Sequence, residues 1–299
     1  LKTERRSMWG ISSAITLPSV INLDGNPKSI FKRASNGLLT ISEKKSRITC
    51  KMFNSKLIRL LYANYRAFRY GFIFLRTKNF RTPKRICFNR QTIGISSPDD
   101  GTKLFKEIFL HDEYFLRRIC RDRIFKIVDI GANVGFFSLT ARSFFPLAEI
   151  HAYEPSKSNF HFLKENGLNF NFKPYLSAVG KENCLGNILE SGDAGCLSNF
   201  HKDDSGTCQM ISLSKVISRF SGNIDLLKLD CEGWEYELLS CAKEMEKVCY
   251  LTMQYHDKSF EQVREILTSI NFSVLHFFEY PFNTGIILAK NLAYTPIRL

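Results

Sequence analysis

The sequence predicts an α/β fold in which a mostly parallel, seven-stranded sheet is doubly wound, with helices on both faces. Two observations lead to this prediction. From residue 126 onward, short apolar runs of strand length alternate with segments of helical periodicity, which is typical of a parallel sheet with crossover helices. The last two apolar runs are too closely spaced for a crossover helix, so the final strand should run antiparallel.

The first half of this alternation is regular. Apolar runs predict the first three strands, at 126–130, 148–153 and 174–179. Helical periodicity predicts the two connecting helices, at 136–144 and 156–167. Gly167 stands where the second of these helices should end.

Residues 181–212 interrupt the alternation with glycines and many polar side chains. We expect a hairpin or lid here, with a strand near 207–212. The alternation then resumes, with helices expected at 213–220, 235–242 and 259–270. The remaining strands are expected at 224–229, 247–255, 272–278 and 284–289.

The turn after the first strand, Asp129-Ile130-Gly131-Ala132-Asn133-Val134-Gly135, is the most informative segment. Two glycines four residues apart let the backbone approach a ligand closely, and the N-terminus of the following helix offers free N–H groups. Asp129 argues against a phosphate ligand, because a carboxylate attracts a cation or an amine instead. A ligand with a carboxylate, an amine and a sulfonium meets both demands, and S-adenosylmethionine is such a ligand.

Other nucleotide-binding motifs do not fit this turn. A dinucleotide fingerprint requires glycine where the chain has Asn133 and Phe136, and the Gly-Lys-Ser/Thr ending of a P-loop is absent. The sequence therefore argues against a nicotinamide-dependent oxidoreductase. An ordinary strand–turn–helix with tight packing remains the alternative for this segment on its own.

A second acidic residue, Glu154, ends the second predicted strand, 25 residues after Asp129. In a doubly wound sheet, an acid at this position hydrogen-bonds the ribose hydroxyls of an adenosine. The pair of acids at neighbouring strand ends thus favours a nucleoside-containing ligand.

A third acidic segment, Asp225-Leu226-Leu227-Lys228-Leu229-Asp230-Cys231-Glu232-Gly233-Trp234-Glu235, combines a buried strand with a cluster of carboxylates. Together with the glycine turn, it resembles the motifs of the FkbM-like methyltransferases. Further matches are Glu107-Ile108-Phe109, Tyr114, Glu154-Pro155-Ser156, Asn159 and Ala178-Val179-Gly180. The resemblance covers about residues 100 to 290 and implies a Rossmann-like class I methyltransferase fold with S-adenosylmethionine as the cofactor.

The resemblance also implies roles for the residues at the strand ends. The methionine end of the cofactor is assigned to Asp129, Gly131, Asn133 and Gly135. The ribose is assigned to Glu154, and the adenine to Ser177 or Ala178.

The acceptor side is assigned to Asp230 and Glu232, with His256 as a candidate base. Three alternatives stay open: a solvated loop histidine for His256, a helix cap for Glu235, and a metal site at Asp230 and Glu232. Because the histidines and cysteines lack metal-ligand spacing, no metal is expected. Gln254 departs from the glutamate that the family often has there.

Charge divides the chain into segments. Residues 1–100 carry 20 Lys and Arg against 5 Asp and Glu, whereas the remainder is close to neutral. Residues 1–51 show no periodicity and are expected to be a disordered or non-native leader. A basic helical or hairpin extension is expected at 52–100 and the methyltransferase domain at 101–299. Nine cysteines without a Cys-x-x-Cys pair indicate a reducing cytoplasm.

Residues 57–75 are rich in apolar and aromatic side chains but contain Arg59, Arg66 and Arg69, which argues against a transmembrane span. The favoured interpretation is a helix packed on the catalytic domain with its arginines solvated. The alternatives are a helix lying on an anionic membrane, which would make the protein peripheral, and an RNA-contacting helix.

The resemblance implies O-methylation of a hydroxyl of a sugar, a glycan or a secondary metabolite. The acceptor is therefore expected to be a small molecule or glycan, with no specific nucleic acid. The alternative is a catalytically inactive module of the same fold that binds RNA or membrane through its basic N-terminal region.

Overall fold

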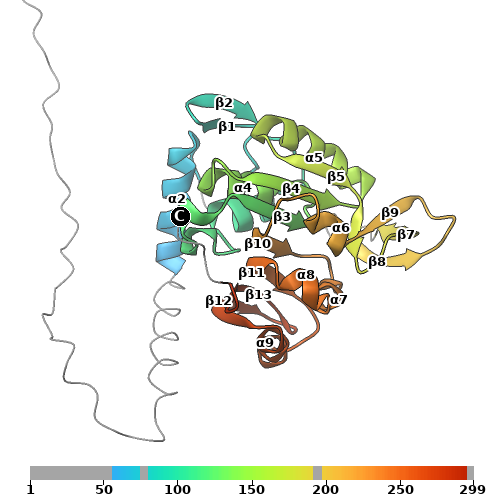
Figure 1. The fold of residues 1–299 in the computed structure, drawn as a ribbon. Helices are drawn as coiled ribbons and strands as arrows, with labels where there is room; N and C mark the ends of the chain where they lie inside the picture. The colour runs from blue at the N-terminus through green and yellow to red at the C-terminus, as the bar shows by residue number, and fades with distance from the viewer. Residues whose placement is uncertain (1–55, 75–79, 191–196, 295–299) are drawn as a thin grey trace, which may run out of the picture. The chain divides into compact units, whose positions relative to one another are not determined.

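The computed structural model describes residues 56–74, 80–190 and 197–294 (Figure 1). The chain divides into two units, 1–49 and 50–299, and every described residue belongs to the second. The leader expected at 1–51 lies outside the described residues. The extension expected at 52–100 contains helix α2 (Lys56–Arg69) and an antiparallel hairpin of β1 (Arg85–Phe88) and β2 (Gln91–Gly94).

The centre of the second unit is a seven-stranded sheet with the order β12-β13-β11-β10-β3-β4-β5. Its strands are β3 (Lys126–Ile130), β4 (Glu149–Glu154), β5 (Lys173–Leu176), β10 (Ile224–Leu229), β11 (Val248–Tyr255), β12 (Phe272–Tyr280) and β13 (Thr284–Asn291). Neighbouring strands pair in parallel, except that β13 is antiparallel to both β11 and β12. The predicted doubly wound sheet with an antiparallel last strand is confirmed.

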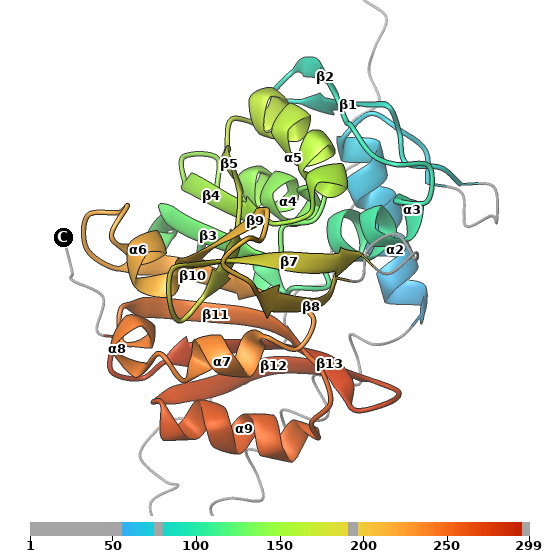
Figure 2. The same ribbon diagram turned by 90° about the vertical axis from the view of Figure 1, so that its right-hand side faces the viewer.

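Helices cover both faces of this sheet (Figures 1 and 2). One face carries α2, α3 (Thr102–Leu104), a π-helical segment at Phe105–Leu110, α4 (Phe136–Phe144) and α5 (Lys157–Phe170). The other carries α6 (Leu213–Ile217), α7 (Glu235–Leu239), α8 (Ala242–Met245) and α9 (Phe260–Ser269). Two 3₁₀ turns, Leu116–Arg118 and Arg121–Arg123, precede β3.

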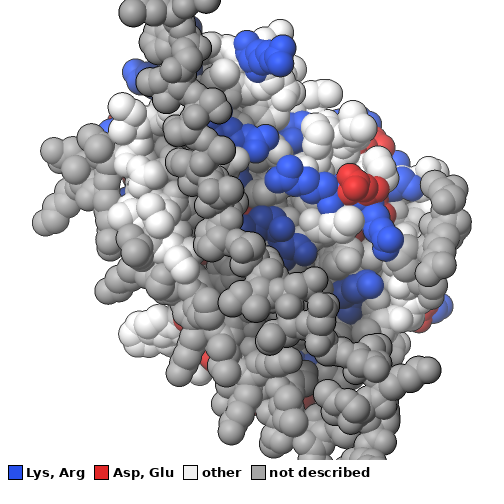
Figure 3. Space-filling view, turned by 90° about the vertical axis from the view of Figure 1, so that its left-hand side faces the viewer, with Lys and Arg blue, Asp and Glu red and all other residues white. Residues whose placement is uncertain are grey.

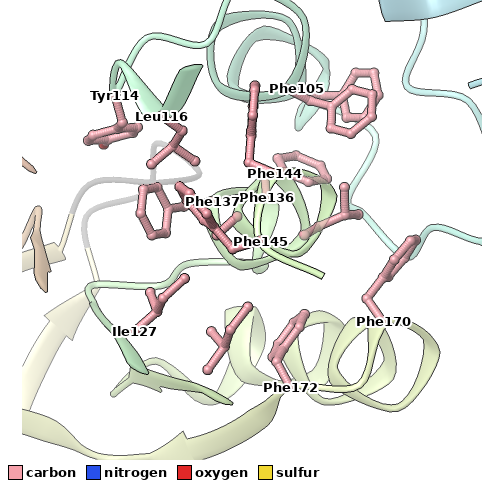
Figure 4. Close-up of a cluster of buried hydrophobic side chains, with 14 of the residues drawn as sticks. Phe105, Tyr114, Leu116, Ile127, Phe136, Phe137, Phe144, Phe145, Phe170 and Phe172 are labelled. Atoms are coloured by element: carbon pink, nitrogen blue, oxygen red, sulfur yellow. The ribbon is translucent and has the colours of Figure 1, made fainter. Parts of the chain in front are cut away.

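Alternation along the strands sends side chains into two separate cores. In β3, Ile127 belongs to the core under α4 and α5, whereas Val128 and Ile130 belong to the core under α6 to α9. Figure 4 shows the phenylalanines of α4 packed between the segment that carries Phe105 and the sheet. Each phenylalanine buried in this way contributes about 1.5–3 kcal/mol, so α4 is held firmly against the sheet.

The third predicted strand, at 174–179, is wrong as a single strand. The chain kinks at Ser177, and β5 stays in the main sheet while β6 (Ala178–Gly180) pairs with β9 (Cys208–Ser212). With β7 (Cys184–Glu190) and β8 (Leu197–Lys202), these strands form a separate four-stranded sheet of order β6-β9-β7-β8. The hairpin and the strand expected within 181–212 are therefore present.

Helix α2 differs from the expected helix with solvated arginines. Arg66 is only 4 % exposed and points inward, with its guanidinium 4.5 Å from the ring centre of Phe109 and 4.8 Å from that of Phe144. It also donates a hydrogen bond to Ser143 Oγ. The aromatic rings satisfy the buried cation through cation–π attraction, and α2 thereby docks on the core with an arginine rather than an aliphatic residue.

Candidate functional site

The candidate site lies at the carboxyl ends of β3 and β10, where the spatial order of the strands reverses. The chain runs outward from β3 to β4 and β5 and later returns to β10 on the other side of β3. Open α/β sheets bind ligands in the crevice at such a switch point. Two turns meet here, residues 131–135 after β3 and residues 230–234 after β10.

Gly131 lets these two turns touch. Its φ is +72°, and a Cβ at this position would lie 1.7 Å from the carbonyl oxygen of Asp230. Because no side chain fits, the backbone of the first turn can lie directly against the second. The glycine that the sequence singled out for ligand approach is thus also required for contact between the turns.

Asp129 is fully buried beneath this contact. Ser138 donates its hydroxyl to Asp129 Oδ2 at 2.7 Å, and the ammonium of Lys228 lies 3.3 Å from Asp129 Oδ1. Lys228 stands directly beside Asp129 in the parallel pairing of β10 with β3. The sequence suggested that Asp129 attracts a cation or an amine, and in this structure that cation is the ammonium of Lys228.

Lys228 connects this buried carboxylate to the glycine turn. Its ammonium donates to the carbonyl oxygens of Ile130 and Gly131 and lies 3.6 Å from Asp230 Oδ2. Burial lowers the pKa of Lys228, but the charges of Asp129 and Asp230 outweigh this effect, and the pKa lies above its usual value. Lys228 is therefore charged, and it fixes the carbonyls of the turn.

Glu154, at the end of β4, is nearly completely buried and accepts two backbone hydrogen bonds. The N–H of Asn133 donates to Oε2 at 2.8 Å, and that of Ser156 donates to Oε1 at 2.9 Å. Burial raises the pKa of Glu154 to about 7. A carboxylate has about four acceptor positions, so both oxygens retain capacity for a ligand.

Asp230 and Glu232 follow β10 on the second turn. Tyr114 donates its hydroxyl to Asp230 Oδ2 at 2.7 Å. Glu232 has a left-handed φ of +54°, and the following Gly233 has a φ of +103° with open space where a Cβ would lie. Burial and the charge of Asp230 raise the pKa of the Glu232 carboxyl to about 7.

His256, just after β11, lies against two glutamates. Its Nε2 is 3.6 Å from Glu232 Oε2, and its Nδ1 is 3.5 Å from Glu235 Oε1. Burial lowers the pKa of His256, but Glu235 and Glu232 outweigh it and raise the pKa to about 9. The imidazole is therefore held as a cation within an ion-pair network.

Glu235 is fully buried and accepts hydrogen bonds from the backbone N–H groups of Cys231 at 2.8 Å and Gly233 at 2.9 Å. It fixes the second turn just before α7 and is structural, but it does not cap that helix, whose N-cap residue Trp234 has no side-chain cap hydrogen bond.

Asp230, Glu232 and His256 could each offer one ligand atom to a metal ion, with these atoms within 4.8 Å of one another. The ammonium of Lys228, 3.6 Å from Asp230, already supplies a positive charge to this group of side chains.

Two hollows meet at this edge of the sheet. The larger, which we call the acidic cleft, has a volume of about 610 Å³. Its charged lining consists of the carboxyl groups of Asp100, Glu107, Glu113, Glu154, Asp230 and Glu232 and the ammonium groups of Lys103 and Lys228. Burial and the charge of Glu107 raise the pKa of Glu113 to about 8. The remaining carboxylates leave the cleft with an excess of negative charge.

The smaller hollow, which we call the apolar pocket, has a volume of about 50 Å³. Its lining includes Tyr153, Pro155, Ala178 and Trp234, and Gly131 borders both hollows. Ser177 also lines it, and the buried hydroxyl of Ser177 has no hydrogen-bond partner among the residues that the structure describes. A buried unpaired hydroxyl is costly, so this group is suited to a polar atom of a ligand.

The structure gathers most of the sequence-predicted residues around these hollows. Gly131, Asn133, Glu154, Asp230 and Glu232 line the acidic cleft, and Ser177 and Ala178 line the apolar pocket. Three lie behind this lining: Asp129 under Lys228, Gly135 against Leu163, and His256 against Glu232 and Glu235.

Five charged groups of the cleft were not predicted as site residues: Asp100, Lys103, Glu107, Glu113 and Lys228. Lys228 could have been found as the one charged residue in the otherwise apolar run 226–229, where only a paired lysine can be buried. Glu113 has no comparable signal, because it reaches the cleft from an irregular turn between Leu110 and Leu116.

Comparisons with known proteins agree with this geometry. Residues 129–274, which contain both turns, match the methyltransferase FkbM domain. Among curated proteins, the chain is 29 % identical over 126 residues to 31-O-demethyl-FK506 methyltransferase FkbM of Streptomyces tacrolimicus, covering 41 % of this chain and 48 % of that protein. It is 33 % identical over 85 residues to methyltransferase sdnD of Sordaria araneosa, covering 28 % of this chain and 32 % of that protein. The matches span half or less of these relatives.

Solved methyltransferase structures resemble the chain more distantly. Magnesium protoporphyrin IX methyltransferase (ChlM) of Synechocystis PCC 6803, solved with bound SAM, is 11 % identical with a TM-score of 0.40, over 82 % of this chain and 96 % of that chain. The Methanococcus jannaschii fibrillarin pre-rRNA processing protein is 14 % identical with a TM-score of 0.40, over 57 % and 69 %. The sequence motifs, the domain match over residues 129–274 and the named relatives all show similarity to the FkbM methyltransferase family in the part of the chain that contains both turns.

Proposed function

We propose that this protein transfers a methyl group from S-adenosylmethionine to a hydroxyl oxygen of a sugar, a glycan or a secondary metabolite. The observation that carries the proposal is the meeting of the apolar pocket and the acidic cleft at Gly131. An adenosine with a charged amino-acid tail is a molecule of this kind, with one flat apolar end and one cationic end.

The residues present fit this cofactor. Ser177 and Ala178 would hold the adenine in the apolar pocket, where the unpaired Ser177 hydroxyl can bond a ring nitrogen. Glu154 would accept the ribose hydroxyls with its remaining acceptor positions. The excess negative charge of the cleft favours a ligand that carries a sulfonium and an ammonium.

Asp129 acts in this proposal as a positioning residue. It holds Lys228, and Lys228 holds the carbonyls of Ile130 and Gly131, so the turn that borders both hollows keeps one shape. The N–H groups of that turn, with Asn133, would bind the methionine end. When bound, the sulfonium supplies an activated methyl group, and the chain needs to align the acceptor and exclude water.

The acceptor hydroxyl must also lose its proton, and Glu232 is the best-placed base. Its pKa of about 7 lets it accept a proton near neutral pH, and His256 holds its Oε2 at 3.6 Å. Tyr114 and Lys228 both contact Asp230, which suits Asp230 for orienting a hydroxyl rather than for taking its proton. His256, with a pKa of about 9, is already protonated at neutral pH and is therefore less suited as the base.

The 31-O-demethyl acceptor in the name of the Streptomyces relative supports an oxygen as the methylated atom. The negative cleft supports a neutral or cationic acceptor over an anionic one, because an anion would be repelled.

The test has two parts. Calorimetric titration of the full chain with S-adenosylmethionine should show binding at one site. Methyl transfer from radiolabelled S-adenosylmethionine to a panel of glycosides and hydroxylated polyketide lactones should then be measured for Glu232→Gln, Asp230→Asn and the control Glu237→Gln, whose side chain is half exposed at 49 %.

Glu232→Gln and Asp230→Asn should lower the transfer rate by about 10²–10⁴-fold while cofactor affinity changes little. The wild-type rate should rise as the pH passes through about 7, since Glu232 must be deprotonated, and this rise should be missing in Glu232→Gln. Absence of S-adenosylmethionine binding would refute the proposal, and near-normal transfer in both amide variants would refute the assigned roles.

A further inference from the structure

The outer face of α2 carries three large apolar side chains beside the exposed Asn64 and Arg69, whereas the exposed face of a surface helix is usually polar. Leu61, Tyr65 and Phe68, spaced i, i+4 and i+7, are 61 %, 57 % and 84 % exposed. We call these three residues the apolar stripe. The inner face meanwhile buries Arg66 between aromatic rings. Since α2 docks on the core without the stripe, these side chains stay exposed, and Arg69 donates a hydrogen bond to the Tyr65 hydroxyl beside them.

The surroundings of the stripe are strongly basic. The sequence has no Asp or Glu between residues 56 and 98, and six cations among the described side chains of this range are at least partly exposed: Arg59, Arg69, Arg81, Lys84, Arg85 and Arg90. Figure 3 shows Lys and Arg side chains gathered on this side of the molecule, with few Asp and Glu among them. Just beyond α2, Ile73 adds another apolar side chain that is 79 % exposed.

A hollow of about 650 Å³ adjoins the end of α2 and contributes more cations. We call it the basic cleft, and its lining includes Arg69, Arg90 and Arg121 with a single acid, Asp122. Leu147, which is 82 % exposed, also borders it. Apolar side chains and guanidinium groups therefore stand side by side here.

We propose that the apolar stripe and the basic cleft dock this protein on an anionic lipid surface. Apolar side chains at helical spacing, flanked by arginines, are what a helix needs to lie in the interface of an anionic bilayer. The stripe would enter the acyl boundary while the arginines bind lipid phosphates. RNA fits less well, since the stripe itself contains no cation to contact a phosphate.

The geometry supports a helix that lies on the membrane rather than one that crosses it. The fourteen residues of α2 extend about 21 Å, less than the roughly 30 Å of hydrocarbon in a bilayer. No helix in the described part of the chain is long and apolar enough to span a membrane.

The test is cosedimentation of the full-length chain with vesicles of phosphatidylcholine, alone or mixed with phosphatidylglycerol. The mixed vesicles should bind at least about tenfold more strongly, and added salt should weaken this binding. Leu61→Ser combined with Phe68→Ser should lower binding to mixed vesicles by about tenfold or more. Arg90→Gln combined with Arg121→Gln should lower it by a similar factor.

The matched control is Leu168→Ser combined with Leu292→Ser, which removes two exposed leucines elsewhere and should leave binding unchanged. All variants should keep the wild-type circular dichroism spectrum, because every altered side chain is exposed. Failure of the full chain to bind mixed vesicles would overturn the proposal, including the case in which it binds RNA or forms dimers through the stripe instead. Vesicle binding that survives loss of the stripe would also overturn it, because charge elsewhere would then be responsible.

Discussion

Replacing Asp129 with alanine should destabilise the protein, because it leaves the buried cation of Lys228 without its main partner. Removing one member of a buried ion pair costs about 3–5 kcal/mol. Lys228 keeps Asp230 at 3.6 Å and two backbone carbonyls, so we expect the lower end, about 3 kcal/mol. For a chain of this size, that corresponds to a melting temperature lower by about 6–12 °C.

Two further variants separate charge from packing. Asp129→Asn keeps the shape and an acceptor for the Ser138 hydroxyl but removes the charge, and should still be strongly destabilised. Combining it with Lys228→Met removes both charges and should recover part of the loss, with a coupling of about 1–3 kcal/mol.

The loss in Asp129→Asn should also depend on pH. Without Asp129, burial should lower the pKa of Lys228 below its unfolded value, so the folded state binds fewer protons than the unfolded state. The free energy of unfolding of this variant then rises as pH increases through the lowered pKa. The difference in unfolding free energy between the variant and the wild type becomes smaller.

The assay is urea unfolding followed by circular dichroism, at several pH values, with the cofactor absent. An unfolding free energy of Asp129→Ala within about 0.5 kcal/mol of the wild type would show that Lys228 does not depend on Asp129, since ordinary surface substitutions fall in that range.

Arg66→Ala should lower the free energy of unfolding by about 2–4 kcal/mol, because packing and cation–π contacts are lost. Arg69→Ala, at an exposed position, should change it by no more than about 0.5 kcal/mol. Equal effects of the two substitutions would contradict the inward placement of Arg66. Ser177→Ala should weaken S-adenosylmethionine binding by about 0.5–1.5 kcal/mol in calorimetry, and unchanged affinity would remove this hydroxyl from the adenine site. The melting temperature should fall as pH rises from about 5 to 9. The folded state binds more protons than the unfolded state in this range, because folding raises the pKa of Glu113 to about 8 and that of His256 to about 9. A melting temperature that rises with pH would contradict these pKa values.

The main sheet could be predicted because its signals are local. The strand at 126–130 matches β3 at both ends, since its apolar run is bounded by a charged residue and a glycine turn. The antiparallel last strand followed from the short distance between β12 and β13, which leaves no room for a crossover.

The two incorrect predictions have a common cause. Where the local sequence pattern is ambiguous, tertiary contacts determine the structure. The run 174–179 reads as one strand, but β6 finds a partner in β9, far away in sequence, and leaves the main sheet. Arg66 reads as a solvated residue of an amphipathic helix, but three aromatic rings surround its guanidinium.

The same limit applies to the site. Strand ends predicted which acids would gather, because parallel strands bring their carboxyl ends to one edge. The pairing of Lys228 with Asp129 depends on the register between β10 and β3, which the sequence does not reveal. The burial that raises the pKa of Glu232 is likewise a property of the folded chain.

The most direct test of the proposed function is a crystal structure of the full chain with S-adenosylhomocysteine. We expect the adenine in the apolar pocket with a hydrogen bond to Ser177, the ribose hydroxyls on Glu154, and the amino-acid tail over Gly131 and Asn133. A ligand bound outside these two hollows, or ribose hydroxyls bonded elsewhere than to Glu154, would contradict this expectation.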